Sequence, residues 1–431
     1  MLKLALYKRS IKWAIALALL ALPGILPAYG QVQVGGDFMV RVYSLKYFDT
    51  RDNRDDLNYL RLAGKLHVDA PIGDVASVHT DFVTISENPV FRTRAIGGSG
   101  SLLYGIAQIY GEVLTPDVPL VDLARLRVGR QHYMLGQGLT LGSSYYMTDN
   151  YDGLRVDLSR GLWTFGYMGA VTAQEVSEGG YNPEPGGNHI HVAKLEYDLY
   201  DHVLLGYYVY EKQLGVFNDN TIIGLGSTGS IVLSDLEYFG EFATQKFNTL
   251  PGLPDKGGIA YMAGVSYSWT QGPFRIIKAE VRTAGYQGDD AKTDKVETFE
   301  PFYPTWWWGD QTAYVNGDIG GDYPHRGIQM EGSRVWYGRI YVSPKAVPKV
   351  RLQLQYANVD DWVNNDDITE PDDEFGIKLY YEASSNIRFQ ARYFRRIANA
   401  EDADINDSGT ITKSEDRYNV QRMMMEFRFK F

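Results

Sequence analysis

The chain contains no cysteine among its 431 residues. This absence excludes disulfide frameworks, cysteine-ligated zinc sites, a lipid-anchored cysteine and c-type haem attachment. Long apolar runs are also missing: after residue 30 no stretch of 18 consecutive apolar residues occurs, so no membrane-spanning helix is expected there. The formal net charge is −11 at pH 7, and no nucleic-acid partner is expected. The segment GLGSTG at 224–229 is followed by further strand-like sequence instead of a helix, so no organic cofactor is expected.

The first thirty residues have the pattern of a secretory signal peptide. A basic start, MLKLALYKRSIK, precedes the apolar segment WAIALALLALPGIL, which is too short to span a membrane with confidence. The small-x-small sequence AYG then ends just before Gln31. We therefore expect residues 1–30 to be cleaved on export and residues 31–431 to form the mature protein.

Aromatic residues and two-residue alternation are abundant. The 32 tyrosines suit a membrane interface, where one end of the ring is apolar and the other is hydrated. At the C-terminus Met423, Met425, Phe427, Phe429 and Phe431 alternate with mostly polar residues, so one strand face suits lipid and the other water. A terminal Phe on such a strand resembles the ending of bacterial outer-membrane barrels. The alternative is an edge strand of a soluble sandwich.

The same alternation predicts eighteen strands along the chain. They are expected to begin near residues 34, 57, 75, 102, 121, 150, 162, 190, 202, 220, 236, 258, 274, 326, 347, 375, 386 and 417. Short and long connections alternate between them, and the longest is expected at about 287–325. The predicted fold is all-β: a closed antiparallel transmembrane β-barrel of about 18 strands, with short periplasmic turns and long extracellular loops.

Strand parity directs many basic side chains toward the lumen of this barrel. The predicted pore-lining cations are Arg61, Lys65, Arg125, Arg127, Arg155, Lys278, Arg282, Arg339, Arg351, Arg388, Arg392 and Arg428. Opposing acids, among them Glu237, Glu241, Glu280, Glu382 and Glu426, are fewer. Rings of Arg and Lys favour anions in a pore. The alternative is that these residues form a lattice of ion pairs that stiffens the wall.

The stretch DINDSGTITKSE has the residue spacing of a calcium loop. Side-chain oxygens are expected from Asp404, Asn406 and Ser408, a backbone carbonyl from Thr410, a water-mediated contact from Thr412 and a bidentate carboxylate from Glu415. An EF-hand would flank the loop with helices, whereas here strand-like sequence follows. We therefore expect weak Ca²⁺ binding in loop 404–415, at the cell surface. The alternative is an ordinary hairpin loop rich in Asn, Asp, Ser and Gly.

Two further clusters suggest interactions. Trp306, Trp307 and Trp308 either stack on saccharide rings at a channel mouth or pack as filler against the barrel rim. The acidic run at 360–374 has no basic residue, and on an outer surface it would gather divalent cations beside lipopolysaccharide phosphates. Membrane lipid and lipopolysaccharide are therefore expected partners.

Four ordered segments resemble the alginate export family of outer-membrane β-barrels: RVGRQ at 127–131, DGLRVDL at 152–158, EFATQ at 241–245 and FEPFYPTWWWGD at 299–310. The resemblance runs over nearly the whole mature chain. It implies an eighteen-stranded barrel with an Arg-lined conduit for an anionic polysaccharide. Carried over, Arg127, Arg130 and Arg155 would belong to the basic pore region.

The functional expectation is a porin in the outer membrane of a Gram-negative-type bacterium. It would pass small anionic or polar solutes passively, saccharides or an anionic polysaccharide included, and would not be an enzyme. One alternative is a structural barrel that forms a scaffold or sheath for a periplasmic or surface partner. Another is an outer-membrane hydrolase, for which Ser77, His79 and Asp81, with His67 and Asp69, are inward-facing candidates.

Overall fold

A computed structural model of the chain describes fifteen segments of it. They are residues 31–48, 57–91, 101–142, 151–172, 189–212, 219–231, 235–248, 256–270, 272–288, 299, 333–361, 370–399, 402–405, 411–414 and 418–431. Within these segments all regular structure is β-strand. No helix long and apolar enough to cross a membrane occurs among the described residues.

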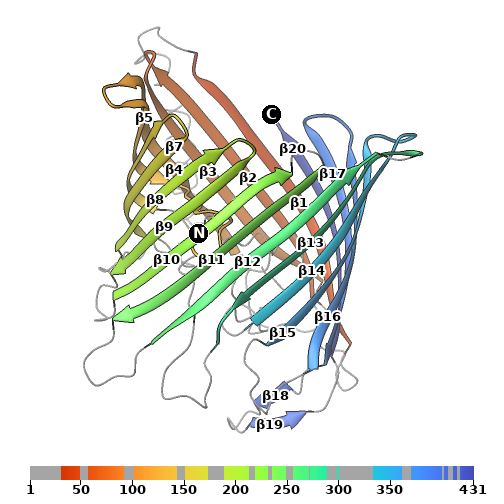
Figure 1. Ribbon diagram of the computed structural model, residues 1–431. Helices are drawn as coiled ribbons and strands as arrows, with labels where there is room; N and C mark the ends of the chain where they lie inside the picture. The colour runs from red at the N-terminus through yellow and green to blue at the C-terminus, as the bar shows by residue number, and fades with distance from the viewer. Residues whose placement is uncertain are drawn as a thin grey trace, which may run out of the picture.

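Eighteen strands form one antiparallel sheet (Figure 1). The first nine are β1 (Gln33–Phe48), β2 (Leu57–Ile72), β3 (Ala76–Phe91), β4 (Ser101–Val118), β5 (Val121–Gln131), β6 (Tyr151–Arg160), β7 (Trp163–Thr172), β8 (His189–Leu199) and β9 (His202–Lys212). The others are β10 (Asp219–Ile231), β11 (Leu236–Asn248), β12 (Lys256–Trp269), β13 (Phe274–Tyr286), β14 (Ser333–Pro344), β15 (Val350–Asp361), β16 (Glu370–Glu382), β17 (Ile387–Asn399) and β20 (Tyr418–Lys430). A separate hairpin consists of β18 (Asp402–Ile405) and β19 (Ile411–Ser414).

The sheet closes on itself because β1 pairs with both β2 and β20. Its last residue takes part: the Phe431 N–H donates to the Gly36 carbonyl and the Gly36 N–H to the Phe431 carbonyl, both at 3.0 Å. The predicted closed eighteen-stranded barrel is therefore confirmed. The predicted start of one strand, near residue 326, lies outside the described residues, which resume at Ser333, the first residue of β14.

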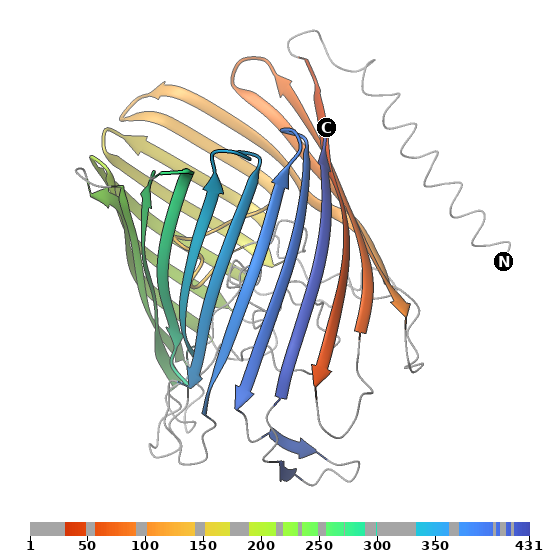
Figure 2. The same ribbon diagram turned by 90° about the vertical axis from the view of Figure 1, so that its right-hand side faces the viewer.

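The strand ends joined by short turns and those that lead into the longer connections lie at opposite rims of the barrel (Figure 2). The short turns span residues 73–75, 119–120, 161–162, 200–201, 232–235, 270–273, 345–349 and 383–386, at the rim that also holds the C-terminus. The longer connections begin at residues 49, 92, 132, 173, 213, 249, 287, 362 and 400. The β18–β19 hairpin lies in the last of these, beyond the opposite rim.

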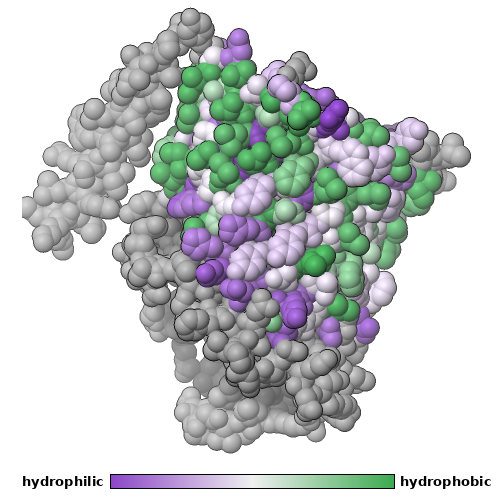
Figure 3. All heavy atoms as spheres, turned by 60° about the vertical axis from the view of Figure 1, so that its left-hand side comes forward, coloured by the Kyte–Doolittle hydropathy of each residue, from purple (hydrophilic) through white to green (hydrophobic). Residues whose placement is uncertain are grey.

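The outer and inner faces of the wall differ in polarity. On β1 the outward side chains of Phe38 and Val42 are 41% and 48% exposed, whereas Asp37, Met39 and Arg41 between them are buried on the inner side. Most of the upper part of the face in Figure 3 is hydrophobic, and ring-shaped, more polar side chains cross it lower down. A closed barrel with an apolar exterior and a polar interior can be surrounded by the hydrocarbon of a membrane while its polar side chains stay inside.

A buried ion pair crosses the seam where β1 meets β20. The Arg41 Nη2 lies 2.7 Å from the Glu426 Oε2, and both side chains are nearly inaccessible to solvent. Arg388 of β17 approaches the other oxygen of Glu426 at 3.4 Å. One carboxylate thus links three consecutive strands at the point of closure.

We predict that Glu426→Ala destabilises the barrel by about 3 kcal/mol, because it removes the buried carboxylate that Arg41 and Arg388 share. Unfolding in urea with detergent micelles, followed by heat-modifiable gel migration, measures the change. The control is Glu382→Ala, which breaks the exposed Arg351–Glu382 pair and should cost at most about 1 kcal/mol. Equal losses in both variants would show that the seam pair is no more important than a surface pair.

Candidate functional site: the basic wall of the lumen

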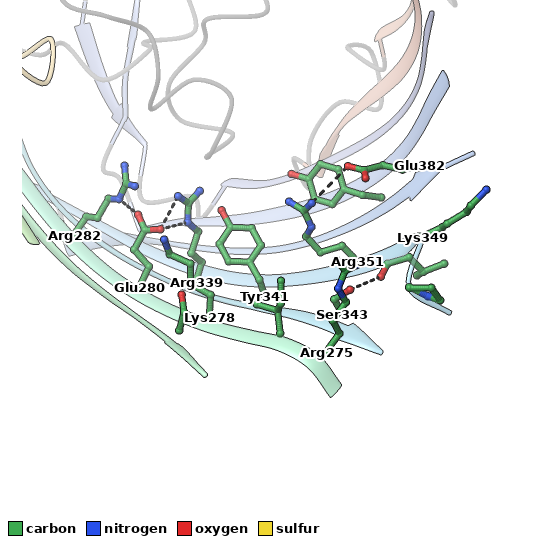
Figure 4. Close-up of a pocket in the computed structure, with 15 residues that line it drawn as sticks. Arg275, Lys278, Glu280, Arg282, Arg339, Tyr341, Ser343, Lys349, Arg351 and Glu382 are labelled. Atoms are coloured by element: carbon green, nitrogen blue, oxygen red, sulfur yellow. Dashed lines mark hydrogen bonds and ion pairs between the residues drawn. The ribbon is translucent and has the colours of Figure 1, made fainter. Parts of the chain in front are cut away.

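A cavity of about 570 Å³ lies against the inner face of β13–β16, toward the rim with the short turns (Figure 4). We call its lining the basic wall. The basic wall consists of Ser268, Arg275, Ile276, Lys278, Glu280, Arg282, Arg339, Tyr341, Ser343, Pro348, Lys349, Val350, Arg351, Tyr380 and Glu382. Six of these side chains are cationic and two are carboxylates. With Glu237 of β11, which pairs with Lys278, the cations exceed the carboxylates by three.

The buried part of the basic wall is an Arg–Glu–Arg triad. The Arg339 Nη2 lies 2.7 Å from the Glu280 Oε2, and Arg282 pairs with the other oxygen of the same carboxylate. Arg339 also lies over the ring of Tyr341, 4.8 Å from its centroid. One carboxylate serves two guanidinium groups, so the triad keeps one positive charge while its geometry is fixed from both sides.

The more accessible cations lie around this triad. The Arg351 Nη2 is 3.5 Å from the Glu382 Oε1, and both side chains are about half exposed. Lys278 pairs with Glu237 of β11 at 2.7 Å. The Lys349 ammonium donates to the Ala383 carbonyl at 2.6 Å, a neutral acceptor, so its charge is not cancelled. An anion entering the cavity therefore meets hydrated cations at its mouth and a fixed pair of guanidinium groups behind them.

Across the barrel, the wall formed by β2–β6 has balanced charges. Arg125 and Arg127 both approach Glu112, and the Arg155 Nε lies 2.7 Å from the Asp157 Oδ2. Lys65 pairs with Asp81 at 2.6 Å. The lumenal cations were expected either to form a lattice of ion pairs or to favour anions. The described side chains form ion pairs on β2–β6, whereas positive charge is in excess around the cavity on β13–β16.

The other predicted basic residues are placed as follows. Arg388 and Arg428 face the lumen and pair with Glu426 and Asp37. Arg392 is also buried on the inner side. The side chain of Arg61 lies outside the described ones.

The expectation carried over for Arg130 is wrong, because this residue lies on the outer face. On β5, Val128 is outward and exposed, while Gln131 is inward and fully buried, so Arg130 alternates to the outside. There its guanidinium makes a bidentate pair with Asp152, with N–O distances of 2.7 and 2.8 Å. Arg130 therefore contributes no charge to the lumen.

His79 is held in a polar cluster on the inner face of β3. Its Nδ1 lies 2.5 Å from the Asp69 Oδ1 and its Nε2 lies 3.1 Å from the Asp81 Oδ1. The Gln108 amide donates to the second Asp81 oxygen at 2.6 Å. A serine nucleophile needs a ring nitrogen that can accept its proton, and both nitrogens of His79 face carboxylates. This geometry disfavours the hydrolase alternative.

The segment 132–142, between β5 and β6, folds back into the lumen. Leu135, Leu139 and Leu141 are fully buried there. They belong to an apolar cluster that includes Tyr151, Met168, Ile190, Ile222, Met262, Tyr286 and Tyr337 of the inner wall. Because these residues lie on strands from β6 to β14, the segment covers a wide sector of the wall and narrows the lumen.

Two tyrosines fasten the backbone of this segment. The Tyr151 hydroxyl donates to the Gly142 carbonyl and the Tyr286 hydroxyl to the Leu139 carbonyl, both at 3.1 Å. Phe299, which lies in the connection after β13, packs against the Tyr286 ring in the same apolar cluster. This inward segment was not predicted from the sequence, although three leucines in a connection between strands indicate a segment that is buried.

Some predicted site residues lie outside the described residues. They are Trp306, Trp307 and Trp308, and residues 406–410 and Glu415 of the calcium-type loop. The backbone of β18 and β19 pairs Asp404 with Thr412. Among the described residues, no group of three or more His, Asp or Glu side chains is arranged to hold a metal ion.

Comparisons with solved structures agree with this architecture. OccK5 (OpdH) of Pseudomonas aeruginosa matches with a TM-score of 0.54 and 13% identity, over 93% of this chain and 98% of that chain. The chain has the barrel fold of that porin. OccK2 (OpdF) of the same organism gives a TM-score of 0.55 at 10% identity, with 93% and 98% covered. OpdK with vanillate gives 0.52 at 11% identity, with 93% and 99% covered.

No family model and no curated protein matches the sequence. At identities of 13% or below, the structural likeness establishes the fold and not the solute. It does not distinguish the alginate export family from other families with this barrel fold.

His132, the first residue of the inward segment, provides a pH-dependent test. Burial is the main cause that lowers its pKa from 6.5 to about 4, and the nearby positive charge of Lys65 acts in the same direction. The unfolded chain therefore binds more protons between these values, and His132 should cost stability as the pH falls from 6.5 to 4. In His132→Asn this contribution is absent. Urea unfolding midpoints at pH 7 and pH 4 should fall further in the wild type than in the variant; equal falls would contradict the burial of His132.

Proposed function

We propose that the protein is a passive outer-membrane channel that favours small anionic or polar solutes. The observation that supports this best is the basic wall: an excess of three positive charges, with Glu237 counted, around a cavity inside a barrel of eighteen strands. Barrels of 16–18 strands are wide enough to keep an aqueous channel. Positively charged rings in such a channel raise the local concentration of anions.

A solute that enters from the rim with the long connections first passes the segment 132–142. The apolar cluster below it reaches Tyr286 on β13 and Tyr337 on β14, whereas the basic wall uses Lys278, Arg282 and Arg339 of the same strands, nearer the short turns. Narrowing and charge selection thus occur in series. Exposed cations such as Arg351, which is about half exposed, exchange water for the solute's negative group.

One of the similar structures is titled as OpdK with vanillate, and vanillate is a small carboxylate. A small organic anion is therefore a suitable first probe for this chain. A conduit for an anionic polysaccharide, as in the alginate export family, is the second candidate, and it is supported by the ordered segments from RVGRQ to FEPFYPTWWWGD. Block of the channel by a soluble uronate oligomer, with passage of longer chains, would favour that candidate.

We predict that proteoliposomes take up a small carboxylate faster than an organic cation of equal size. Lys278→Glu with Arg351→Glu reverses two accessible charges of the basic wall and should abolish or invert this preference, without closing the lumen. The control is Lys246→Glu, since Lys246 is exposed on the outer face between the buried Gln245 and Phe247. A preference that survives in the double variant, or is lost equally in the control, would contradict the role of the basic wall.

A scaffold or sheath remains the structural alternative. A barrel that only encloses a partner needs no charge-selective lumen. Without that partner it would pass anions and cations of equal size at the same rate, so the same uptake comparison separates the two functions.

We also propose that the last connection binds Ca²⁺ weakly. In its support, the β18–β19 ladder brings Asp404 and Thr412, two of the predicted ligands, directly opposite each other. Calcium should protect residues 400–417 from protease in the wild type, and this protection should be lost in Asp404→Ala and Glu415→Gln. Identical cleavage of all three proteins, with and without calcium, would leave the hairpin as a simple turn.

A further inference from the structure

Glu241 is a buried carboxylate on the inner face of β11, and it contacts two different elements. Its Oε2 accepts a hydrogen bond from the backbone N–H of Gln137, in the inward segment, at 2.6 Å. Its Oε1 accepts one from the Tyr207 hydroxyl of β9 at 2.8 Å. The side chain therefore connects the segment to the wall across 104 residues of sequence.

The segment is shaped to receive this carboxylate. Gly136 has a φ of +56°, and a Cβ at this position would lie 2.5 Å from the Glu241 Oε2. Gly138 also has a positive φ, and its N–H donates to the Leu135 carbonyl at 2.9 Å. The turn at 136–138 thus presents the Gln137 N–H while leaving room for the carboxylate, which only glycine at position 136 permits.

Glu241 is buried next to apolar side chains. Met262 of β12 lies directly opposite Glu241, and Ala243 is the next inward position of β11; both belong to the apolar cluster. Burying a carboxylate among apolar side chains is costly unless hydrogen bonds replace water. Here the replacement comes from one donor on the segment and one on the wall, so the carboxylate is best satisfied only when the segment is folded inward.

We propose that Glu241 is the positioning residue of the constriction: it holds the segment 132–142 against the wall and thereby sets the width of the channel. This rests on the proposed channel function. The apolar contacts of Leu135, Leu139 and Leu141 give the segment its affinity for the wall, and they are non-directional. The bonds at Glu241 fix where along the wall the segment lies, because hydrogen bonds are directional.

The test uses the absence of cysteine from the chain. Single cysteines are placed at Thr140, which is fully buried in the segment, and at Met134, which is 58% exposed. In the native background a polar thiol reagent should label Met134→Cys quickly and Thr140→Cys slowly. Adding Glu241→Ala should raise the labelling rate of Thr140→Cys by about ten-fold, as expected for local opening, and leave Met134→Cys unchanged. Single-channel conductance should rise with it, or fluctuate between levels.

Matched variants separate positioning from general damage. Glu196→Gln removes one lumenal carboxylate that pairs with Lys194 on the same strand and is not bonded to the segment. Tyr207→Phe removes only one hydroxyl and should raise the labelling rate of Thr140→Cys less than Glu241→Ala does. This milder variant keeps the test valid if Glu241→Ala fails to fold. Gly136→Ala introduces a Cβ against the carboxylate, whereas Gly161→Ala has a similar φ of +54° and no atom within 4 Å of its Cβ. Of these two glycine variants, only Gly136→Ala should increase the labelling rate of Thr140→Cys.

The outcomes are distinguishable. If Glu241→Ala, Tyr207→Phe and Gly136→Ala leave labelling and conductance like those of Glu196→Gln, Glu241 does not position the segment. If labelling rises in these variants while the wild type shows no anion preference, the positioning role holds and the proposed solute selectivity fails.

Discussion

The structure depends on the requirement that every backbone N–H and C=O within hydrocarbon be hydrogen-bonded inside the protein. A β-sheet meets this requirement only when it has no free edge, and here the closing contact is the pairing of β1 with β20. Closure fixes the two-residue alternation around the whole wall, so each side chain faces either lipid or the lumen. Polar groups that could not face lipid, among them Arg41, Glu280 and Arg339, are thereby gathered inside, where their pairing determines the character of the channel.

The gathered charges are not distributed evenly. On β2–β6 each described basic side chain named above pairs with a carboxylate, and this sector is close to neutral. Around the cavity on β13–β16 the cations outnumber the carboxylates. The inward segment 132–142 occupies the apolar sector toward the other rim. In the proposed channel, a solute would meet a narrowing built from apolar contacts and then a cavity with more cations than carboxylates.

The fold could be predicted from the sequence because strand alternation and turn length are local properties. The lipid-facing sides of Val42 and Met425, for example, follow from parity alone. Parity also placed Lys278 and Arg351 in the lumen, but it could not supply their partners, since Glu237 and Glu382 come from other strands whose register depends on barrel closure. Arg130 was misassigned because it was carried over from a resemblance; the parity of β5 places it outside.

The inward segment was missed for a different physical reason. Its leucines have no strand periodicity, and its site of burial is a surface made by β6–β14, which exists only after the barrel forms. The bond between Gln137 and Glu241 has the same origin, because it joins parts of the chain that are brought together by closure and not by local sequence. Features of this kind need the assembled wall before they can be recognised.

The most direct test of the account is the reversal potential of the purified wild-type protein in a planar bilayer under a salt gradient. The excess positive charge of the basic wall predicts a potential displaced toward the anion's equilibrium value, with a larger displacement at low ionic strength, where screening is weak. A cation-selective current, or a displacement that does not change with salt, would contradict the claim that these lumenal cations govern what passes.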